Sequence, residues 1–243
     1  LIEDLAVAQG AYFKKKPLGS FGQVSILSFG KGKVVDAGIG GAFLTDSLNI
    51  YEKSKKLSRG FALVNNTNIK NINYVNNLHT KFYNDYYLYN KNVNFKKFKM
   101  EINLKSKFFL FNISQKHINN IYKKCTKLDS LIKIRKKNFS ILRNKIIRLK
   151  KKNIYIPKMI KGEVPWRLNI FFKDFYKRNY FLKVLLSEKI NASSWYSGLD
   201  LFFYKNLNLK NSDLHSKSIL NLWINNKCDK GYQKKIIKFI NQL

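Results

Sequence analysis

The alternation of hydrophobic and polar residues predicts two strands near the start of the chain. Residues 2–4 end like a strand, and residues 23–29 alternate at first and then become continuously apolar, as a mostly buried strand does. A glycine-rich turn and a second apolar run at 42–45 follow, before a helix that opens near Asp46 or Ser47. This segment therefore reads as strand, tight turn, strand and helix.

A long amphipathic helix is predicted from Leu128 onward. Its apolar positions recur at helical spacing as far as Leu149, with lysines on the outer face, and Pro157 ends the region. Before this helix, residues 62–105 are dominated by Asn, Lys and Tyr and show no clean period. An irregular connection, poorly formed helices and an insertion all fit that stretch, and the pattern does not choose between them.

The C-terminal residues predict a small α+β unit. Residues 166–172 alternate in the manner of a strand with one apolar face. Asp174 is placed to cap a helix, the chain then returns through residues 190–192 toward Trp195, and Asp229 is placed to cap a terminal helix. The predicted order of this unit is strand, helix, strand and helix.

Composition predicts a soluble globular chain in the cytoplasm. Its 243 residues suffice for a buried core, and no apolar run approaches the roughly 18 to 20 residues that span a bilayer. Cys125 and Cys228 show neither metal-ligand spacing nor a disulfide framework, which fits a reducing compartment. We therefore expect no metal ion and no membrane partner.

The net charge of +33 points at first sight to nucleic acid. However, only six of the 47 basic residues are Arg, whereas phosphate binding favours the two-pronged guanidinium group. Lys, Asn and Ile are raised together, and about one residue in eight is Asn, which indicates a bias in the coding DNA. The lysines are also spread along the chain. A basic nucleic-acid-binding protein is therefore a further alternative, not the preferred function.

Several familiar motifs fail on inspection. Gly38-Ile39-Gly40-Gly41 is not a dinucleotide fingerprint, because the third glycine of that motif would fall on Phe43. The Gly-Lys pairs of the preceding turn lack the upstream glycine of a phosphate-binding loop. The histidines, His79, His117 and His215, lie far apart among polar residues and are interpreted as surface residues. No elbow motif or Ser-His-Asp order supports a hydrolase.

Three residues near the strand ends have the chemistry that pyridoxal 5'-phosphate requires. A lysine must bond to the cofactor aldehyde, a carboxylate must pair with the pyridinium nitrogen, and hydroxyls must hold the phosphate. Lys33 lies in the glycine turn, Asp4 at the first strand end and Ser28 at the second. Ligands of parallel sheets bind beyond the carboxyl ends of the strands, where these positions fall. Residue types alone do not separate this site from a solvated turn, because the chain has 41 lysines.

The order of residues in this region resembles that of the pyridoxal-phosphate-dependent sugar aminotransferases of the DegT/StrS type. That family runs from an acidic strand end, through a Gly-Ser-x-Gly turn, to Ser-Phe, three residues, the Schiff-base lysine and a Gly-x-Gly-Gly turn. The matching segments here are Ile2-Glu3-Asp4 through Gly10-Ala11, Leu18 to Ser25, Ser28 to Lys33, and Gly38 to Asp46. The specific match covers about the first 50 residues.

The resemblance implies an α/β fold of the PLP-dependent transferase type (fold-type I). Residues 1–60 would be the C-terminal part of the cofactor-binding large domain, 61–125 a connecting segment, and 126–243 the long helix and the small α+β C-terminal domain. Lys33 would form the Schiff base and move the substrate proton, Asp4 would pair with the ring nitrogen, and Ser28 would bind the phosphate. Relatives that remove a hydroxyl carry His in place of this lysine, so Lys33 favours transamination.

The implied reaction moves an amino group, with glutamate as the expected donor, onto a nucleotide-linked keto-sugar in surface polysaccharide or related sugar biosynthesis. Such relatives are homodimers with shared active sites. Because Leu1 to Asp4 reads as the end of a strand with nothing before it, we expect the chain to be the C-terminal portion of a longer parent enzyme and to be inactive alone. A catalytically silent fragment of the same fold, acting only in assembly, is the alternative.

Some positions depart from the family pattern. Val7 stands where the family shows Gln or His, and Gln9 lies two residues out of register. Three segments resemble the small domain of a subgroup: Pro165-Trp166-Arg167, Ser194-Trp195-Tyr196 and Asn221-Leu222-Trp223. The proline and histidine that usually follow the tyrosine are replaced, with Gly198 and Asp200 nearby. The three tryptophans are interpreted as residues that pack in the hydrophobic core, because their side chains are large and mostly apolar.

Overall fold

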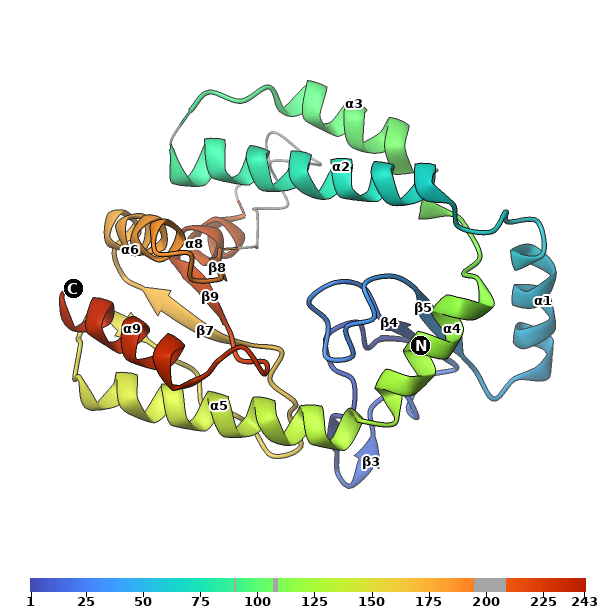
Figure 1. Ribbon diagram of the computed structural model, residues 1–243, viewed down its shortest axis with the longest axis horizontal. Helices are drawn as coiled ribbons and strands as arrows, with labels where there is room; N and C mark the ends of the chain where they lie inside the picture. The colour runs from blue at the N-terminus through green and yellow to red at the C-terminus, as the bar shows by residue number, and fades with distance from the viewer. Residues whose placement is uncertain (90, 107–108, 195–208) are drawn as a thin grey trace.

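The chain folds into two units that are bridged by a pair of helices (Figure 1). The computed structural model describes residues 1–89, 91–106, 109–194 and 209–243. For description, residues 1–60, drawn in blue, are called the N-terminal unit, and residues 126–243, drawn from yellow-green to red, are called the C-terminal unit. The helices α2 (Asn66–Tyr83) and α3 (Phe95–Ser106) lie across the top of Figure 1.

The N-terminal unit is built on a three-stranded sheet in the order β1-β4-β5. Its strands are β1 (Ile2–Asp4), β4 (Val24–Ser28) and β5 (Gly41–Leu44), and a small hairpin of β2 (Tyr12–Phe13) and β3 (Lys16–Pro17) lies apart from them. The β1–β4 pair is parallel and the β4–β5 pair is antiparallel. Strand, turn and strand are therefore present as predicted.

Two details of this unit bear on the sequence-based expectations. Helix α1 (Leu48–Ser58) begins after Ser47, whose side chain accepts a hydrogen bond from the Ile50 amide, so the predicted helix start is confirmed. The expectation of a mostly buried second strand is wrong, because only the first two residues of β4 are buried and Ile26 is 43% exposed. The run is buried at Val24 and Ser25 and again at Phe29, whereas the residues between them are half-buried or exposed.

The middle of the chain is helical in the described residues, which excludes an irregular connection and leaves the possibility of an insertion untested. It contains α2 (Asn66–Tyr83), the π-helix η1 (Asn84–Leu88), α3 (Phe95–Ser106) and α4 (Gln115–Cys125). Asn65 and Asn68 form a reciprocal capping box at the start of α2, so asparagine here acts as a helix-starting residue. Phe82 stacks on Phe98 of α3 at a centroid distance of 4.0 Å, which joins the two helices through aromatic contacts.

The C-terminal unit is a four-stranded antiparallel sheet in the order β6-β7-β9-β8, with helices packed on it. Its elements are α5 (Leu128–Arg148), β6 (Ile154–Tyr155), β7 (Arg167–Phe172), α6 (Phe175–Ser187), β8 (Ala192–Ser193), α8 (Lys210–Ser218), β9 (Ile219–Trp223) and α9 (Lys230–Asn241). The long helix and the first strand are present as predicted. Asp174 and Asp229 cap α6 and α9 through hydrogen bonds from backbone amides, which confirms both predicted caps.

The central strand β9 was not predicted. Its sequence, Ile-Leu-Asn-Leu-Trp, has no alternation, and its first four residues are buried. A strand covered on both faces loses the period of two that marks a half-exposed strand. The two faces differ in kind. Leu220 and Leu222 join Leu168 and Ile170 of β7 in one hydrophobic core, whereas Asn221 donates a hydrogen bond to Asn169 on the opposite face.

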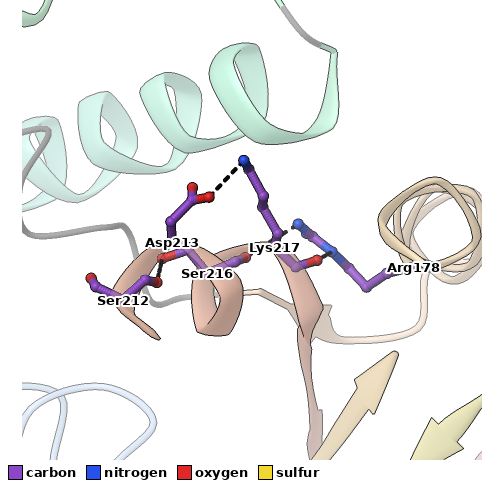
Figure 2. Close-up of polar contacts among 5 residues, drawn as sticks. All are labelled: Arg178, Ser212, Asp213, Ser216 and Lys217. Carbon is purple, nitrogen blue, oxygen red and sulfur yellow. Dashed lines mark hydrogen bonds and ion pairs between the residues drawn. The ribbon is translucent and has the colours of Figure 1, made fainter. Parts of the chain in front are cut away.

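Arg178 ties helix α8 to helix α6. It is fully buried, and its guanidinium group donates to the backbone carbonyls of Lys217 and Ser216 at 3.0 and 3.3 Å (Figure 2). These carbonyls lie in the last turn of α8, where the helix dipole favours a cation. The Lys217 side chain points away in Figure 2 to the carboxylate of Asp213, at 2.7 Å. A buried arginine therefore caps α8 from the neighbouring helix.

Two interpretations of aromatic residues need correction. Trp166 and Trp223 are half-buried and belong to none of the hydrophobic clusters of the described residues, so their interpretation as core residues is wrong. Trp195, with Tyr196, Gly198 and Asp200, lies outside the described residues. His215 is exposed as expected, but His79 is half-buried against Phe98 and burial lowers its pKa.

His117 is also half-buried, and its Nδ1 lies 2.8 Å from the hydroxyl of Ser114 at the start of α4. No helix in the described ranges is long and apolar enough to cross a bilayer. Within the same ranges, no three His, Cys, Asp or Glu side chains gather where they could hold a metal ion.

Candidate active site

Two parallel strands bring Asp4 and Ser28 to the same end of the N-terminal sheet. Asp4 is in register with Ile26 of β4, so its position lies two residues before Ser28 on the neighbouring strand. The carboxylate of Asp4 accepts a hydrogen bond from the Ala6 amide at 2.9 Å, which turns the chain directly after the strand. Both residues are therefore at the carboxyl ends of parallel strands, where α/β proteins bind ligands.

Lys33 lies in a tight turn that follows β4. Its amide donates to the Gly30 carbonyl at 3.2 Å, and Gly30 pairs with Gly38 across the base of the turn. Both carboxylate oxygens of Asp36 accept from backbone amides, those of Gly32 and Gly38, at 2.8 and 3.0 Å. Gly32 and Gly38 have φ values of +83° and +84°, so both turns need glycine.

The Lys33 ammonium group lies where three features of the site meet. Burial lowers its pKa most strongly, the nearby Asp4 carboxylate raises it, and the Arg167 guanidinium lowers it. The net effect is a lowered pKa, so a larger share of the neutral, nucleophilic amine exists near neutral pH than for an ordinary lysine. The Nζ atom also lies 5.6 Å from the centre of the Trp166 ring. The Asp4 carboxylate is thus close enough to Lys33 to act on the charge of its amine.

Arg167 stands between two tryptophan rings beside this lysine. Its guanidinium carbon lies 4.0 Å from the centre of the Trp166 ring and 3.8 Å from that of Trp223. Arg167 and Trp223 are direct partners across β7 and β9, so the sheet register produces the second contact. The Ser193 hydroxyl accepts a hydrogen bond from Arg167 Nη1 at 2.8 Å. The stacked cation is thus held in place from β8, β9 and the residue before β7.

Gln9 joins the two strand ends to the lysine turn. It is buried, its amide nitrogen donates to the Ser28 carbonyl at 2.9 Å, and its carbonyl oxygen accepts from the Val35 amide at 3.0 Å. Val7, at the position where the family shows Gln or His, is 38% exposed and has no such reach. Gln9 is therefore a structural tie of this turn, although it is out of register with the family pattern.

The residues present fit pyridoxal phosphate in kind and in place. Lys33 is a half-buried amine with a lowered pKa, and Asp4 is a carboxylate near it. The Ser28 hydroxyl lies at the base of the glycine turn, where it accepts from the Gly30 amide at 3.4 Å. The structure places Asp4 and Ser28 at the same end of the sheet and Lys33 in the turn that follows Ser28. Their roles toward a cofactor stay predictions.

Sequence reasoning did not single out Arg135, Arg167 or Trp166 as parts of this site. Arg135 donates from α5 to the Lys33 carbonyl at 2.9 Å, and the Trp166 indole donates to the Gly32 carbonyl at 2.7 Å. One signal was available in the composition. Arg is rare in this lysine-rich chain, with six examples against 41 lysines, so each retained Arg marks a place where Lys is a poor substitute.

Comparison with known proteins finds a family match over the region that contains Asp4, Ser28 and Lys33. Residues 1–83 match the model of the DegT/DnrJ/EryC1/StrS aminotransferase family. A search of curated protein sequences finds no match. Similar solved structures include the aminotransferase TlmJ from Streptoalloteichus hindustanus, with a TM-score of 0.71 and 14% identity over 100% of this chain. Helicobacter pylori PseC, an aminotransferase involved in the biosynthesis of pseudoaminic acid, has a TM-score of 0.66 and 16% identity over 99% of this chain.

The Spr1654 protein from Streptococcus pneumoniae, solved in its PLP form, has a TM-score of 0.62 and 14% identity over 99% of this chain. The chain spans 57%, 58% and 56% of the lengths of these three structures. At these identities the likeness shows the fold, and it confirms the predicted fold class. The expected cofactor agrees with the PLP form of the third structure. Residues 1–83 thus match the model of the DegT/DnrJ/EryC1/StrS aminotransferase family, and the whole chain has the fold of part of the aminotransferase structures to which it is similar.

Proposed function

We propose that this chain is the C-terminal portion of a pyridoxal-phosphate-dependent sugar aminotransferase and that Lys33 is its cofactor-binding lysine. The observation that carries the proposal is the environment of the Lys33 amine. It combines a half-buried position, a lowered pKa and a neighbouring carboxylate, Asp4, at the end of a parallel strand. A lowered pKa raises the share of neutral amine relative to an ordinary lysine, and the neutral amine is the form that attacks an aldehyde.

Asp4 and Ser28 have separate tasks in this proposal. Asp4 keeps the pyridine nitrogen protonated through an ion pair, and Ser28 donates its hydroxyl hydrogen to the phosphate. When bound, pyridoxal phosphate would supply an electron sink for the electron pair left by a departing substrate proton. Lys33 would hold the cofactor through its amine and, once released, would carry the proton between the substrate carbon and the cofactor. Trp166 and Arg167 cover the lysine on the side of the C-terminal unit.

The substrate classes follow from the family and from the charge of the site. The acceptor would be a nucleotide-linked keto-sugar, and the donor an amino acid such as glutamate. Both carry negative charge, and the stacked Arg167 near Lys33 supplies a fixed cation for an anionic substrate. The parent enzyme would act as a homodimer in sugar biosynthesis in the cytoplasm. The present chain alone should not complete the catalytic cycle, because it spans little more than half the length of its solved relatives.

The proposal is tested by trapping the cofactor on the chain. The protein is mixed with pyridoxal phosphate, reduced with borohydride and digested, and the labelled lysines are identified by mass spectrometry. We expect Lys33 to be labelled in preference to Lys31, an exposed lysine of the same turn. K33A should abolish the preferred label, whereas the matched control K31A should leave it unchanged, and D4N should weaken it.

A catalytically silent fragment gives a different result in the same experiment. This second candidate is supported by one observation: the present chain spans only 57% of the length of the solved aminotransferase TlmJ. Such a fragment would keep the glycine turns and lack any Lys33-dependent absorbance or label. Labelling spread evenly over the exposed lysines, with Lys33 no different from Lys31, would reject the enzymatic proposal in favour of the silent fragment.

A further inference from the structure

The carbonyl groups on either side of the Lys33 α-carbon, those of Gly32 and of Lys33 itself, are both held from the C-terminal unit. The Gly32 carbonyl accepts from the Trp166 indole at 2.7 Å, and the Lys33 carbonyl accepts from Arg135 Nη2 at 2.9 Å. The partners are 134 and 102 residues away in sequence. Two consecutive carbonyls with distant side-chain donors fix the backbone of the lysine in two directions.

One guanidinium group links the two donors. Arg135 Nη1 donates to the Trp166 carbonyl at 2.7 Å, so Arg135 holds the backbone of Trp166 while Trp166 holds Gly32. Arg135 is only 5% exposed. Burial lowers its pKa to about 10 and the Asp36 carboxylate opposes that shift, so the side chain stays charged near neutral pH. Hydrogen bonds from a charged donor are about twice as strong as neutral ones.

The residues after Lys33 are held on the same side. Val34 is buried against Val164, with Leu128 and Ile132 of α5 packed on the same small cluster. The turn is thus attached to α5 and to the segment before β7 by both apolar and polar contacts. The β1–β4–β5 sheet contributes a separate tie, through Gln9 and Val35.

We propose that Arg135 and Trp166 are positioning residues that hold the Lys33 backbone, so that the C-terminal unit sets the place of the lysine amine. We refer to this pair as the lysine clamp. It rests on the proposed function for its catalytic meaning, but its geometry is independent of any cofactor. Without the clamp the turn can move outward, the amine becomes hydrated, and it loses the closeness to the Trp166 ring and Arg167.

The test measures the reactivity of Lys33 in the full chain without cofactor. Each variant is labelled with a small amine-reactive anhydride from pH 6 to 10, and the extent of labelling at Lys33 is divided by that at Lys31. The variants are R135M, which removes both hydrogen bonds of the guanidinium, and W166F, which keeps an aromatic ring and removes the indole donor. The matched control is R143M.

Arg143 makes the control sharp because it lies on the same helix and makes the same kind of contact elsewhere. Its guanidinium donates to the carbonyls of Pro157 and Ile156 at 3.0 and 3.4 Å. We expect R135M and W166F to move the midpoint of Lys33 labelling to higher pH and to lower its labelling several-fold at pH 8, tenfold for each pKa unit regained. R143M should leave the midpoint in place.

Two results would overturn the clamp. One is an unchanged Lys33 midpoint in R135M and W166F. The other is an equal shift in R143M, which would show a general loss of stability instead of a local tie. If R135M does not fold, the milder W166F decides the question alone against R143M. Because no pyridoxal phosphate is present, a failure of Lys33 to bind the cofactor would reject the proposed function without affecting this result.

Discussion

The two units of the chain differ in how they are held together. Among the described residues, eighteen residues of the C-terminal unit form one buried core together with Leu88, and this core joins three helices to one face of the sheet. The N-terminal unit, which carries Lys33, Asp4 and Ser28, shares two clusters of three buried residues each with its neighbours. The part of the chain with the chemistry is therefore the part with the least core of its own.

The N-terminal unit is held together mainly by hydrogen bonds of polar side chains, whereas the C-terminal unit is held together by apolar packing. Gln9, Glu3 and Asp36 accept hydrogen bonds from backbone amides of the turns that surround the site. At the same time Ile26 and Phe43 of the sheet are 43% and 44% exposed. This unit depends on directed hydrogen bonds and on contacts with α4 and α5, so we expect it to open more easily than the C-terminal unit.

The largest expected effect concerns the reactivity of the two free cysteines. One lies beside a small cluster that the N-terminal unit shares, and the other lies in the large C-terminal core. Cys125, at the end of α4, is half-buried beside the small cluster of Phe29, whereas Cys228 is 3% exposed in the large core. Burial raises the pKa of Cys228 to about 11, so at pH 8 only about one thiol in a thousand is ionised. Burial also raises the pKa of Cys125, but this thiol is only half-buried, so we expect an aromatic disulfide reagent to modify Cys125 roughly tenfold faster or more.

Modification of the two thiols should give a fast and a slow phase. The variants C125S and C228S show which cysteine gives which phase, because each removes one of them. Low urea should accelerate the fast phase first, because the smaller cluster opens before the large core. Equal rates for the two thiols, or a urea response in the reverse order, would show that the two units open together.

Leucine-to-alanine substitutions sharpen the comparison in terms of stability. Leu168 is completely buried in the C-terminal core, so L168A should lower the free energy of unfolding by roughly 2–5 kcal/mol. Leu44 of β5 is 47% exposed, and L44A should cost no more than about 0.5 kcal/mol. Urea titrations followed by circular dichroism measure both. Similar losses in the two variants would contradict the difference in core.

Removal of helix caps should lower the free energy of unfolding by a smaller amount, and again more in the C-terminal unit than in the N-terminal unit. Asp174 accepts from the Tyr176 and Lys177 amides at the start of α6, whose buried residues join the large core, so D174A should cost about 1 kcal/mol. Ser47 caps α1, which has no buried residue. S47A should fray that helix with little effect on global unfolding. A global loss in S47A that matches that of D174A would mean that α1 folds with the core.

The same contrast explains how much of the fold could be predicted from the sequence. Alternation identifies β7, the helical spacing of apolar residues identifies α5, and the capping residues Asp174 and Asp229 identify the starts of α6 and α9. These patterns miss β9, which is covered on both sides, and α2 and α3, whose many Asn and Lys residues hide the helical period. Asparagine has low helix propensity, so tertiary contacts and caps decide that region instead.

The candidate site divides in a similar way. Lys33, Asp4 and Ser28 could be predicted because they lie within 30 residues of each other in a recognisable order. Arg135 and Trp166 could not, because their hydrogen bonds to the lysine turn depend on how two distant segments pack. A tryptophan in a sequence suggests a large residue of the core. Only the pairing of β7 with β9 shows that Trp223 stacks on Arg167 instead.

The smallest expected effect concerns a single carboxylate in the N-terminal unit. Glu3 accepts hydrogen bonds from the amides of Gly19, Phe21 and Gly22 at 2.7, 2.7 and 2.6 Å. The bond from Gly19 contributes most to lowering the pKa of Glu3 below its ordinary value of 4.5. The folded state therefore prefers the ionised carboxylate, and its support of the turn is complete above the unfolded pKa and is lost as pH falls through the folded pKa.

NMR titration of the Gly19 and Gly22 amide shifts from pH 7 to 2 measures this directly. We expect a midpoint below 4.5 in the wild-type chain and no such transition in E3Q. E163Q is the matched control, because Glu163 accepts only from the amide of Ile160 in its own turn. It should leave both glycine shifts unchanged. A midpoint at or above 4.5 would mean that this turn, like the C-terminal unit, is held by packing and not by the carboxylate.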